Sequence, residues 1–183
     1  MKISQTSIPD LMLVETEARI DHRGAFARLY CQDELQSIIG SRKIVQINLS
    51  CTHAVGAVRG LHYQQPLYAE MKLVRCLKGK VLDVAVDLRT GSPTFLQWHA
   101  EELSSQNRHM LVIPEGCAHG FQVMEPDSEL LYLHTEYYTP EAEGGVRYDD
   151  PRLAIPWPLP VAEVSVRDQQ HPRIPSNYLG LKI

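Results

Sequence analysis

The sequence predicts an all-β fold, a sandwich or barrel of the jelly-roll type, on three observations. Apolar and polar residues alternate with a period of two in many short segments. Glycine and proline turn residues, as in RTGSPT and IPEGCAHG, separate these segments at short, fairly even intervals. Only DELQSIIG has the pattern of a helix. Many short strands with turns between them are typical of antiparallel sandwiches and barrels.

The clearest strand is VLDVAVDL, residues 81–88. Its even-numbered positions are all apolar, whereas Asp83 and Asp87 fall on the odd-numbered face. KLVRCL precedes it, and the turn sequence KGK lies between the two, which predicts a hairpin. Asp33 is the expected N-cap of the helix, and Gly40 its end. The other predicted strands are LMLVETEARI, FARLYC, KIVQINLS, FLQWHAEEL, HMLVIP, GFQVM and ELLYLHTEYY.

The chain of 183 residues suits a single domain, 1–183, with 44% apolar and 22% charged residues as in ordinary globular proteins. No internal repeat or low-complexity run occurs. From about residue 151 the character changes, because PRLAIPWPLP has too many prolines for a regular element. We expect this part to form an extended tail along the surface.

Charge and composition exclude several classes of protein. A net charge of −4 provides no basic field for nucleic acid, so an anionic ligand would need locally placed arginines. No apolar run has membrane-spanning length, and MKISQTSIPD lacks the apolar stretch of a signal peptide. The cysteines are widely spaced without a C-x-x-C pair, which favours reduced thiols in a cytoplasmic protein, although an even number also permits disulfides. They are Cys31, Cys51, Cys76 and Cys117.

Sequence motifs of phosphate-binding loops are absent. Neither G-x-G-x-x-G nor G-x-x-x-x-G-K-[ST] occurs, so dinucleotide-binding and P-loop folds have no support. The G-x-S-x-G turn of the α/β-hydrolases is also missing.

The segment RGLHYQQP contains a histidine, His62, between two strand-like residues. A neutral imidazole can abstract a proton near neutral pH if a carboxylate fixes its tautomer. The candidate carboxylates are Asp83, Asp87 and Asp168. The simpler alternative is a ring packed beneath a loop, with its nitrogens bonded to the backbone.

Two further side chains have a structural and a functional interpretation. Lys72 alternates with Val74 and Cys76 on an apolar face, so it either extends outward from an edge strand or enters a cavity as a fixed positive charge. Inside a cavity it would stabilise an oxyanion. Tyr132 shares its strand face with His134, and is either a core aromatic residue or a proton donor opposite a base.

Arginine and metal-ligand patterns complete the candidates. Arg23 precedes a glycine, so the guanidinium and the backbone can approach an anion together; the alternative is a solvated turn. A three-ligand metal site from His62, Glu70 and His119 is the competing hypothesis. The missing second histidine in His62-Tyr63-Gln64 argues against it, because β-barrel proteins with such a metal site usually have His-x-His here.

Several motifs occur in one order: DHRGAFARLYC, VRGLHYQQP, EMKLVRCLKGKVLDVAVDLRTGSPTF, LVIPEGCAHGFQV, LLYLHTEYYTPEAEGGVRYDDP and VSVRD. From about Ile20 to about Asp168 the chain resembles the dTDP-4-dehydrorhamnose 3,5-epimerase family, cupin-fold enzymes that act on nucleotide-linked 4-keto sugars. The resemblance implies a cupin jelly roll and catalysis without a metal or other cofactor. It also implies a homodimer in which N-terminal strands are exchanged.

The resemblance also implies roles for individual residues. His62 matches the family's proton acceptor and Tyr132 its proton donor. Asp168 matches the carboxylate paired with His62, with Asp83 as the alternative. Lys72 matches the lysine beside the keto oxygen of the substrate. A ketone at C4 acidifies the hydrogens at C3 and C5, so a base, an acid and a positive charge together suit epimerisation.

Other positions match residues that contact the substrate. Arg23 and Arg59 match arginines that hold the diphosphate, a task that suits their forked guanidinium. Many members have glutamate where this chain has Arg28, so Arg28 is expected near the substrate, where it either alters the nucleotide or sugar preference or simply reflects a subgroup. The remaining matched positions are Phe26, Gln46, Asn48, His119, Tyr138 and Glu143.

The activity expected from this resemblance is epimerisation at C3 and C5 of a dTDP-linked 4-keto-6-deoxyhexose. The nearest alternative is a 3-only or 5-only epimerase on a related nucleotide sugar. A sugar-nucleotide 3,4-ketoisomerase is a further alternative, which Tyr132 argues against. A metal-dependent oxygenase and a non-catalytic sugar-binding cupin are the alternatives from other classes.

Overall fold

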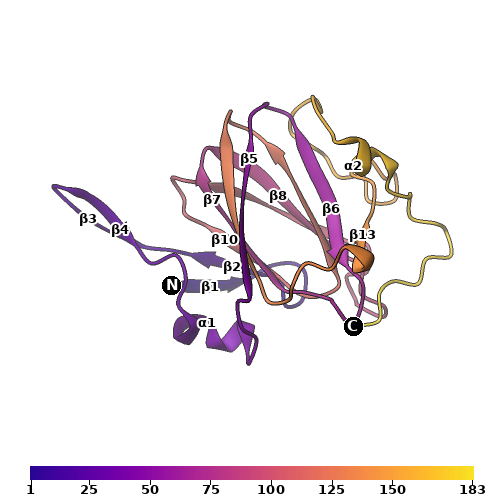
Figure 1. Ribbon diagram of the computed structural model, residues 1–183, viewed down its shortest axis with the longest axis horizontal. Helices are drawn as coiled ribbons and strands as arrows, with labels where there is room; N and C mark the ends of the chain where they lie inside the picture. Colours follow the sequence, from indigo (N-terminus) through magenta and orange to yellow (C-terminus); the bar gives the residue numbers. More distant parts are fainter.

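Two facing antiparallel sheets form the body of the molecule in the computed structural model, which describes residues 1–183 (Figure 1). The first sheet has the order β1 (Lys2–Gln5), β2 (Met12–Glu15), β10 (Met110–Ile113), β7 (Lys72–Lys78), β12 (Ser128–His134), β5 (Gln46–Thr52). The second has the order β13 (Glu143–Gly145), β6 (Val58–Gln64), β11 (Cys117–Val123), β8 (Lys80–Asp87), β9 (Trp98–Ser104). The all-β jelly-roll prediction is confirmed.

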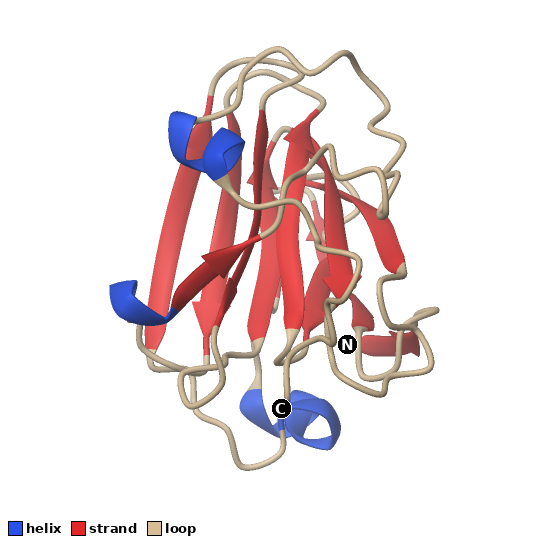
Figure 2. Ribbon diagram, turned by 90° about the vertical axis from the view of Figure 1, so that its right-hand side faces the viewer, coloured by secondary structure: helices blue, strands red, loops and turns tan.

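Helices are short and peripheral, as Figure 2 shows. They are α1 (Gln32–Ile39), the 3-10 turn η1 (Pro140–Ala142) and α2 (Val166–Gln170). None is long and apolar enough to cross a membrane. α1 ends at Gly40 as predicted, where φ is 60°. Its N-cap is Cys31 and not Asp33, which lies in the first turn where its negative charge favours the helix dipole.

Three apolar clusters hold the fold together. One lies between the sheets and includes Val74, Leu111 and Phe121. The second covers the outer face of the first sheet, where Leu35 and Ile39 of α1 pack. The third covers the outer face of the second sheet with C-terminal residues, and includes Leu153, Ile174 and Leu181. Because both sheets are covered on their outer faces, their central strands are buried on both sides.

Strand β8 illustrates this double burial. Val84 and Val86 pack with the C-terminal segment, while Val81 and Ala85 face the space between the sheets. Asp83 shares the inward face with them and has no exposed surface. The predicted alternation of faces is therefore confirmed, and it places a carboxylate inside the molecule.

The predicted hairpin at Lys78–Lys80 is wrong. β7 pairs with β10 and β12 of the first sheet, whereas β8 pairs with β11 and β9 of the second. Gly79, with φ of 74°, lets the chain bend from one sheet into the other. A Cβ at this position would lie 2.4 Å from Ser128 Oγ, so only glycine fits the bend.

The C-terminal segment is more ordered than an extended tail. It runs over the outer face of the second sheet, and Val166–Gln170 forms α2. The Ser165 side chain accepts a hydrogen bond from the Asp168 N–H and caps this helix. The capped turn brings Asp168 beside β6.

An N-terminal hairpin extends away from the two sheets (Figure 1). Its strands are β3 (Ala18–Asp21) and β4 (Gly24–Ala27), which pair only with each other. LMLVETEARI is therefore divided between β2 and β3, and only the start of FARLYC belongs to a strand. Ile20 and Phe26 are 77% and 74% exposed, which is unusual for large apolar side chains on a projecting element.

Candidate active site

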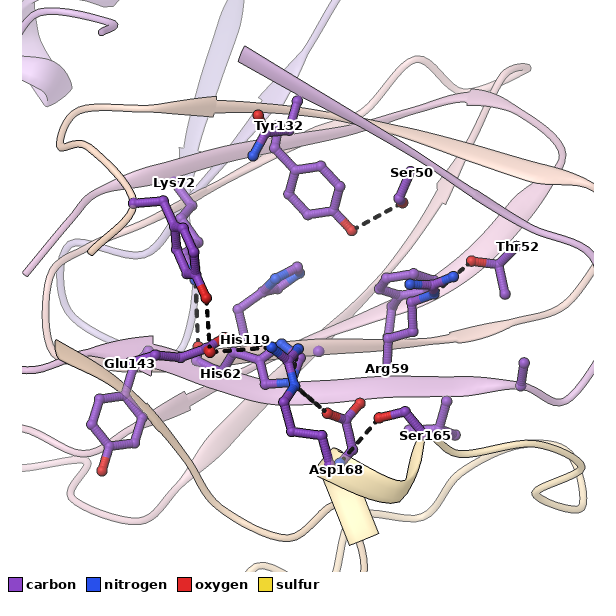
Figure 3. A pocket seen from close by; sticks show the side chains of 18 of the residues that line it. Ser50, Thr52, Arg59, His62, Lys72, His119, Tyr132, Glu143, Ser165 and Asp168 are labelled. Carbon is purple, nitrogen blue, oxygen red and sulfur yellow. Dashed lines mark hydrogen bonds and ion pairs between the residues drawn. The ribbon is translucent and has the colours of Figure 1, made fainter. Parts of the chain in front are cut away.

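A cavity of about 1240 Å³ opens between the two sheets and contains most of the predicted site residues. β5, β7 and β12 form one wall, and β6 and β11 form the other, which the segment around α2 extends. In Figure 3, Tyr132 and Lys72 lie across the cavity from His62 and Asp168. Successive side chains of a strand point to opposite faces of its sheet, and His62, Lys72 and Tyr132 each lie on the face that lines this cavity.

His62 and Asp168 form a hydrogen-bonded pair. His62 Nε2 lies 2.8 Å from Asp168 Oδ1. An ionised carboxylate only accepts hydrogen bonds, so Nε2 carries the ring proton and Nδ1 keeps its lone pair. The pair therefore presents an imidazole in one tautomer, with a free basic nitrogen.

Asp168 is held rigidly and kept ionised. It is 2% exposed, and its Oδ2 accepts a hydrogen bond from the Gly60 N–H at 3.0 Å. Burial alone would raise the pKa of Asp168, but the hydrogen bonds from His62 and Gly60 outweigh it and hold the pKa well below the usual range. Asp83, the alternative partner, is bonded elsewhere.

Asp83 pairs with His119 in a second dyad. His119 Nε2 lies 2.7 Å from Asp83 Oδ1, and the other carboxyl oxygen has no partner. Burial raises the pKa of Asp83, which His119 opposes only in part. His119 lies directly across the β6–β11 ladder from His62. Gly60 lets these strands approach closely, since a Cβ there would be 2.6 Å from Gly120 Cα.

Tyr132 projects from the opposite wall. Its ring packs edge-on against His119 with centroids 6.0 Å apart, and its hydroxyl lies 3.3 Å from Ser50 Oγ. Burial raises the pKa of Tyr132 well above its ordinary value. The phenol is therefore neutral throughout the physiological range, in the state that can donate a proton.

Lys72 belongs to a buried chain of polar groups. Its Nζ lies 3.2 Å from Glu70 Oε1, and Glu70 Oε2 lies 2.6 Å from His134 Nδ1. All three side chains are nearly buried, at 12%, 7% and 11% exposed. Burial would raise the pKa of Glu70, but the contacts with His134 and Lys72 lower it overall. A positive charge thus lies in the cavity wall beside an ionised carboxylate.

Five other predicted contact residues also line the cavity. They are Gln46, Asn48, Arg59, Tyr138 and Glu143. Arg59 Nε donates to Thr52 Oγ1 at 2.9 Å, which fixes the guanidinium at one end of the cavity. The Tyr138 hydroxyl donates to Glu143 at 3.1 Å. These contacts gather an arginine and hydrogen-bonding groups around the dyads.

Three predicted residues do not line the cavity of this chain. Arg23 and Phe26 lie on the projecting hairpin, where Arg23 binds Asp21 at 2.7 Å. Arg28 follows the hairpin and pairs with Glu34. The structure of one chain therefore does not bring these three side chains to His62, and their predicted contacts with the substrate stay predictions.

The predicted metal ligands do not converge, because His62, Glu70 and His119 each bind a different partner. Another trio comes closer: donor atoms of His62, Asp168 and His171 lie within 4.8 Å of one another. Two imidazoles and a carboxylate are suitable ligands for a transition metal. However, the Arg167 guanidinium lies 3.4 Å from His62 Nε2 and 3.5 Å from Asp168, which disfavours a cation there.

Sequence reasoning missed several residues of the site. Arg167, which bridges Glu143 and the His62–Asp168 pair, directly precedes Asp168 in the sequence. His171 packs edge-on against His62, with ring centroids 5.5 Å apart. His134 lies on the same face of β12 as Tyr132 and lines the cavity, a position that the alternation of this strand already indicates.

Comparison with known proteins gives the family. The family model for dTDP-4-dehydrorhamnose 3,5-epimerase matches residues 5–176. This chain belongs to that family. It is 42% identical over 175 residues to the epimerase of Salmonella typhimurium, with 94% of each chain covered. It is 45% identical over 172 residues to that of Pseudomonas aeruginosa, covering 93% of this chain and 94% of the relative.

Solved structures of the family have the same fold. The Legionella pneumophila epimerase RmlC, in complex with dTDP-4-keto-L-rhamnose, superposes with a TM-score of 0.91 at 38% identity, covering 100% of this chain and 98% of that one. ChmJ of Streptomyces bikiniensis, a 3'-monoepimerase in complex with dTDP-quinovose, has a TM-score of 0.86 at 30% identity, covering 92% and 85%. Proteins with this fold therefore include both a 3,5-epimerase and a 3'-monoepimerase.

Proposed function

We propose that this protein epimerises C3 and C5 of a dTDP-linked 4-keto-6-deoxyhexose. The observation that carries the proposal is the His62–Asp168 pair on one wall of the cavity with Tyr132 and Lys72 on the other. Family membership supports the same activity, because the relatives compared above are epimerases of this class.

The residues divide the reaction between the two walls. His62 takes a proton from carbon through Nδ1, while Asp168 stabilises the imidazolium that forms. The electron pair moves into the C4 carbonyl, where the Lys72 ammonium stabilises the enolate oxygen. Tyr132 then returns a proton to the carbon from the other face, and the configuration is inverted. Arg59 binds the diphosphate and holds the ring between the walls.

A matching pair of residues in a relative supports these roles. A solved form of ChmJ is a double mutant with histidine replaced by asparagine and tyrosine by phenylalanine. The two substituted residues are as far apart in that sequence as His62 and Tyr132 are in this one. The substituted histidine and tyrosine of ChmJ thus correspond in spacing to His62 and Tyr132, to which we assign the roles of base and acid.

A single epimerisation is the second candidate, favoured by the likeness to the 3'-monoepimerase ChmJ. Exchange in D₂O distinguishes the candidates. We expect deuterium at both C3 and C5 of dTDP-4-keto-6-deoxyglucose, detected by NMR. Deuterium at one carbon alone would favour the single epimerase, and none at either carbon would refute the proposal.

The active form that we propose is a homodimer in which the β3–β4 hairpins are exchanged. Exposed Ile20 and Phe26 on a hairpin without a sheet to cover it support this arrangement. Exchange would carry Arg23 and Phe26 toward the cavity of the partner, where they are predicted to bind the nucleotide.

A cytoplasmic location is proposed as well, supported by four cysteines that are all free.

A further inference from the structure

We propose that His134, held by Glu70, accepts a hydrogen bond from a hydroxyl group of the bound hexose and so selects the sugar. The inference rests on the proposed function, since it names a contact within the same cavity. Neither Glu70 nor His134 has a part in the proton transfers assigned above. Both nevertheless line the cavity.

The ladders of the first sheet place His134 beside Lys72, within the proposed sugar site. It pairs directly with Gln46 of β5 on one side and with Lys72 of β7 on the other. Directly opposed residues of a ladder project from the same face of the sheet, so all three point into the cavity. Along its own strand His134 follows Tyr132 by two residues, and the two rings stack with centroids 6.0 Å apart. A ligand that touches Lys72 and Tyr132 therefore also meets His134.

Glu70 determines what His134 offers that ligand. Glu70 Oε2 lies 2.6 Å from His134 Nδ1, and the pKa of this carboxyl is lowered, so Glu70 accepts and Nδ1 carries the ring proton. Nε2 is left as an acceptor. Its only neighbour within hydrogen-bond reach is the Asn48 amide at 3.4 Å, a long and weak contact. A nearly buried acceptor with so weak a donor gains from a ligand donor.

The chemistry of the site favours a hydroxyl as that donor. The diphosphate of a nucleotide sugar has no hydrogen to give at neutral pH, and the ionised Glu70 carboxylate would repel it. Arg59 lies in the same cavity and is the group that suits the diphosphate. The hexose also has to lie between His62 and Tyr132, next to His134. The contact is therefore assigned to a ring hydroxyl.

Binding measurements test the contact without turnover. Calorimetry with dTDP-quinovose, which has no ketone to acidify its C–H groups, is compared with dTDP alone. His134→Phe keeps a ring of similar size but removes the acceptor. We expect it to weaken dTDP-quinovose binding about tenfold while leaving dTDP binding within about twofold. His134→Gln, which has an amide oxygen as acceptor, should recover part of the loss.

Two analogues of dTDP-quinovose, one without the C2 hydroxyl and one without the C3 hydroxyl, identify the donor, because these are the ring hydroxyls that a 4-keto substrate retains. Removal of one of these hydroxyls should weaken binding to the unmodified protein about tenfold and have little effect on His134→Phe. His109→Phe is the matched control, because His109 pairs with Glu101 at 3.0 Å outside the cavity. We expect it to bind every ligand as the unmodified protein does.

Each outcome bears on one idea only. Equal losses of dTDP and dTDP-quinovose binding in His134→Phe, or unchanged binding of both, would overturn the assigned contact. If His134→Phe does not fold, equal binding of every deoxy analogue by the unmodified protein overturns it instead. The proposed function fails separately, when the unmodified protein exchanges no deuterium into a 4-keto sugar nucleotide.

Discussion

His62 and Asp168 lie 106 positions apart in the sequence and meet at 2.8 Å. Asp168 reaches this place because Ser165 caps a five-residue helix and the Gly60 N–H binds the second carboxyl oxygen. The carboxylate is fixed before any substrate arrives, so the imidazole is also fixed in tautomer and direction. Preorganisation of this kind lowers the barrier to proton transfer.

Asp168→Asn should leave the fold intact and reduce kcat about 10³-fold to 10⁴-fold. An amide can donate to His62 Nε2, which would place the ring proton on Nδ1 and remove the free base. Steady-state rates on a 4-keto sugar nucleotide measure the loss. Asp127→Asn is the matched control, since Asp127 pairs with His53 at 2.6 Å on the surface, outside the cavity. Equal rates for the two variants would show that Asp168 does not support the base.

Tyr132→Phe should separate proton removal from proton return. The hydroxyl is lost, but His62 and Asp168 keep their contact, so a carbanion still forms. We expect deuterium exchange at one carbon with retained configuration and at least about a 10²-fold loss of inverted product. NMR in D₂O reports exchange and inversion separately. Formation of inverted product at the normal rate would mean that another group donates the proton.

The parts of the site that the sequence could predict are those that follow from strand alternation and from the ordered motifs. Inward and outward side chains alternate along a strand, so the position of Lys72 in β7 and of Tyr132 in β12 is enough to place both on the inner face of the sheet. The motifs supplied the match of Asp168 to the carboxylate partner of His62. No local pattern could distinguish it from Asp83, since that choice depends on which strands meet.

The parts that escaped prediction depend on contacts between distant segments. KGK suits a hairpin turn and a bend between sheets equally well, and only the partners of β7 and β8 decide between them. Helix α2 has five residues, too few for an apolar periodicity to be visible. The pairing of His134 with Glu70 joins residues 64 positions apart, which no short motif reveals.

Asp87 provides a test of stability outside the cavity. Its buried carboxylate accepts hydrogen bonds from Arg89, from Ser92 Oγ at 2.6 Å and from Thr94 Oγ1 at 2.7 Å. Burial would raise the pKa of Asp87, but the Arg89 and Ser92 contacts lower it overall. A depressed pKa means that the stabilisation is present above the unfolded pKa, about 3.9, and is lost as the pH falls through the folded pKa.

Asp87→Asn should therefore lower the free energy of unfolding by about 3 kcal/mol at pH 7, because Arg89 keeps its positive charge but loses the buried carboxylate that pairs with it. The difference between the two proteins should decrease as the pH falls below about 4, where Asp87 takes up a proton in the unfolded chain of the unmodified protein while it stays ionised in the folded one. Urea unfolding at several pH values measures it. A difference that stays constant down to pH 3 would contradict the assigned cause.

The projecting hairpin leads to a prediction about assembly. Ile20 and Phe26 are exposed in one chain, and burial of two such side chains against a partner favours association. A charge at either position would have to enter that interface without a partner charge. We expect the unmodified protein to sediment as the proposed dimer, and Phe26→Asp to sediment as a monomer at the same concentration. Leu179→Asp, at a position 79% exposed near the C-terminus, should remain dimeric.

Binding of dTDP should depend on assembly if Arg23 reaches the cavity of the partner. Arg23→Ala should then remain a dimer and bind dTDP about tenfold more weakly, because one guanidinium contact with the diphosphate is lost. Phe26→Asp should lose both the dimer and the affinity for dTDP. Sedimentation and calorimetry on the same samples separate the two effects. A monomeric Phe26→Asp that binds dTDP normally would show that the hairpin of one chain contributes nothing to the site of another.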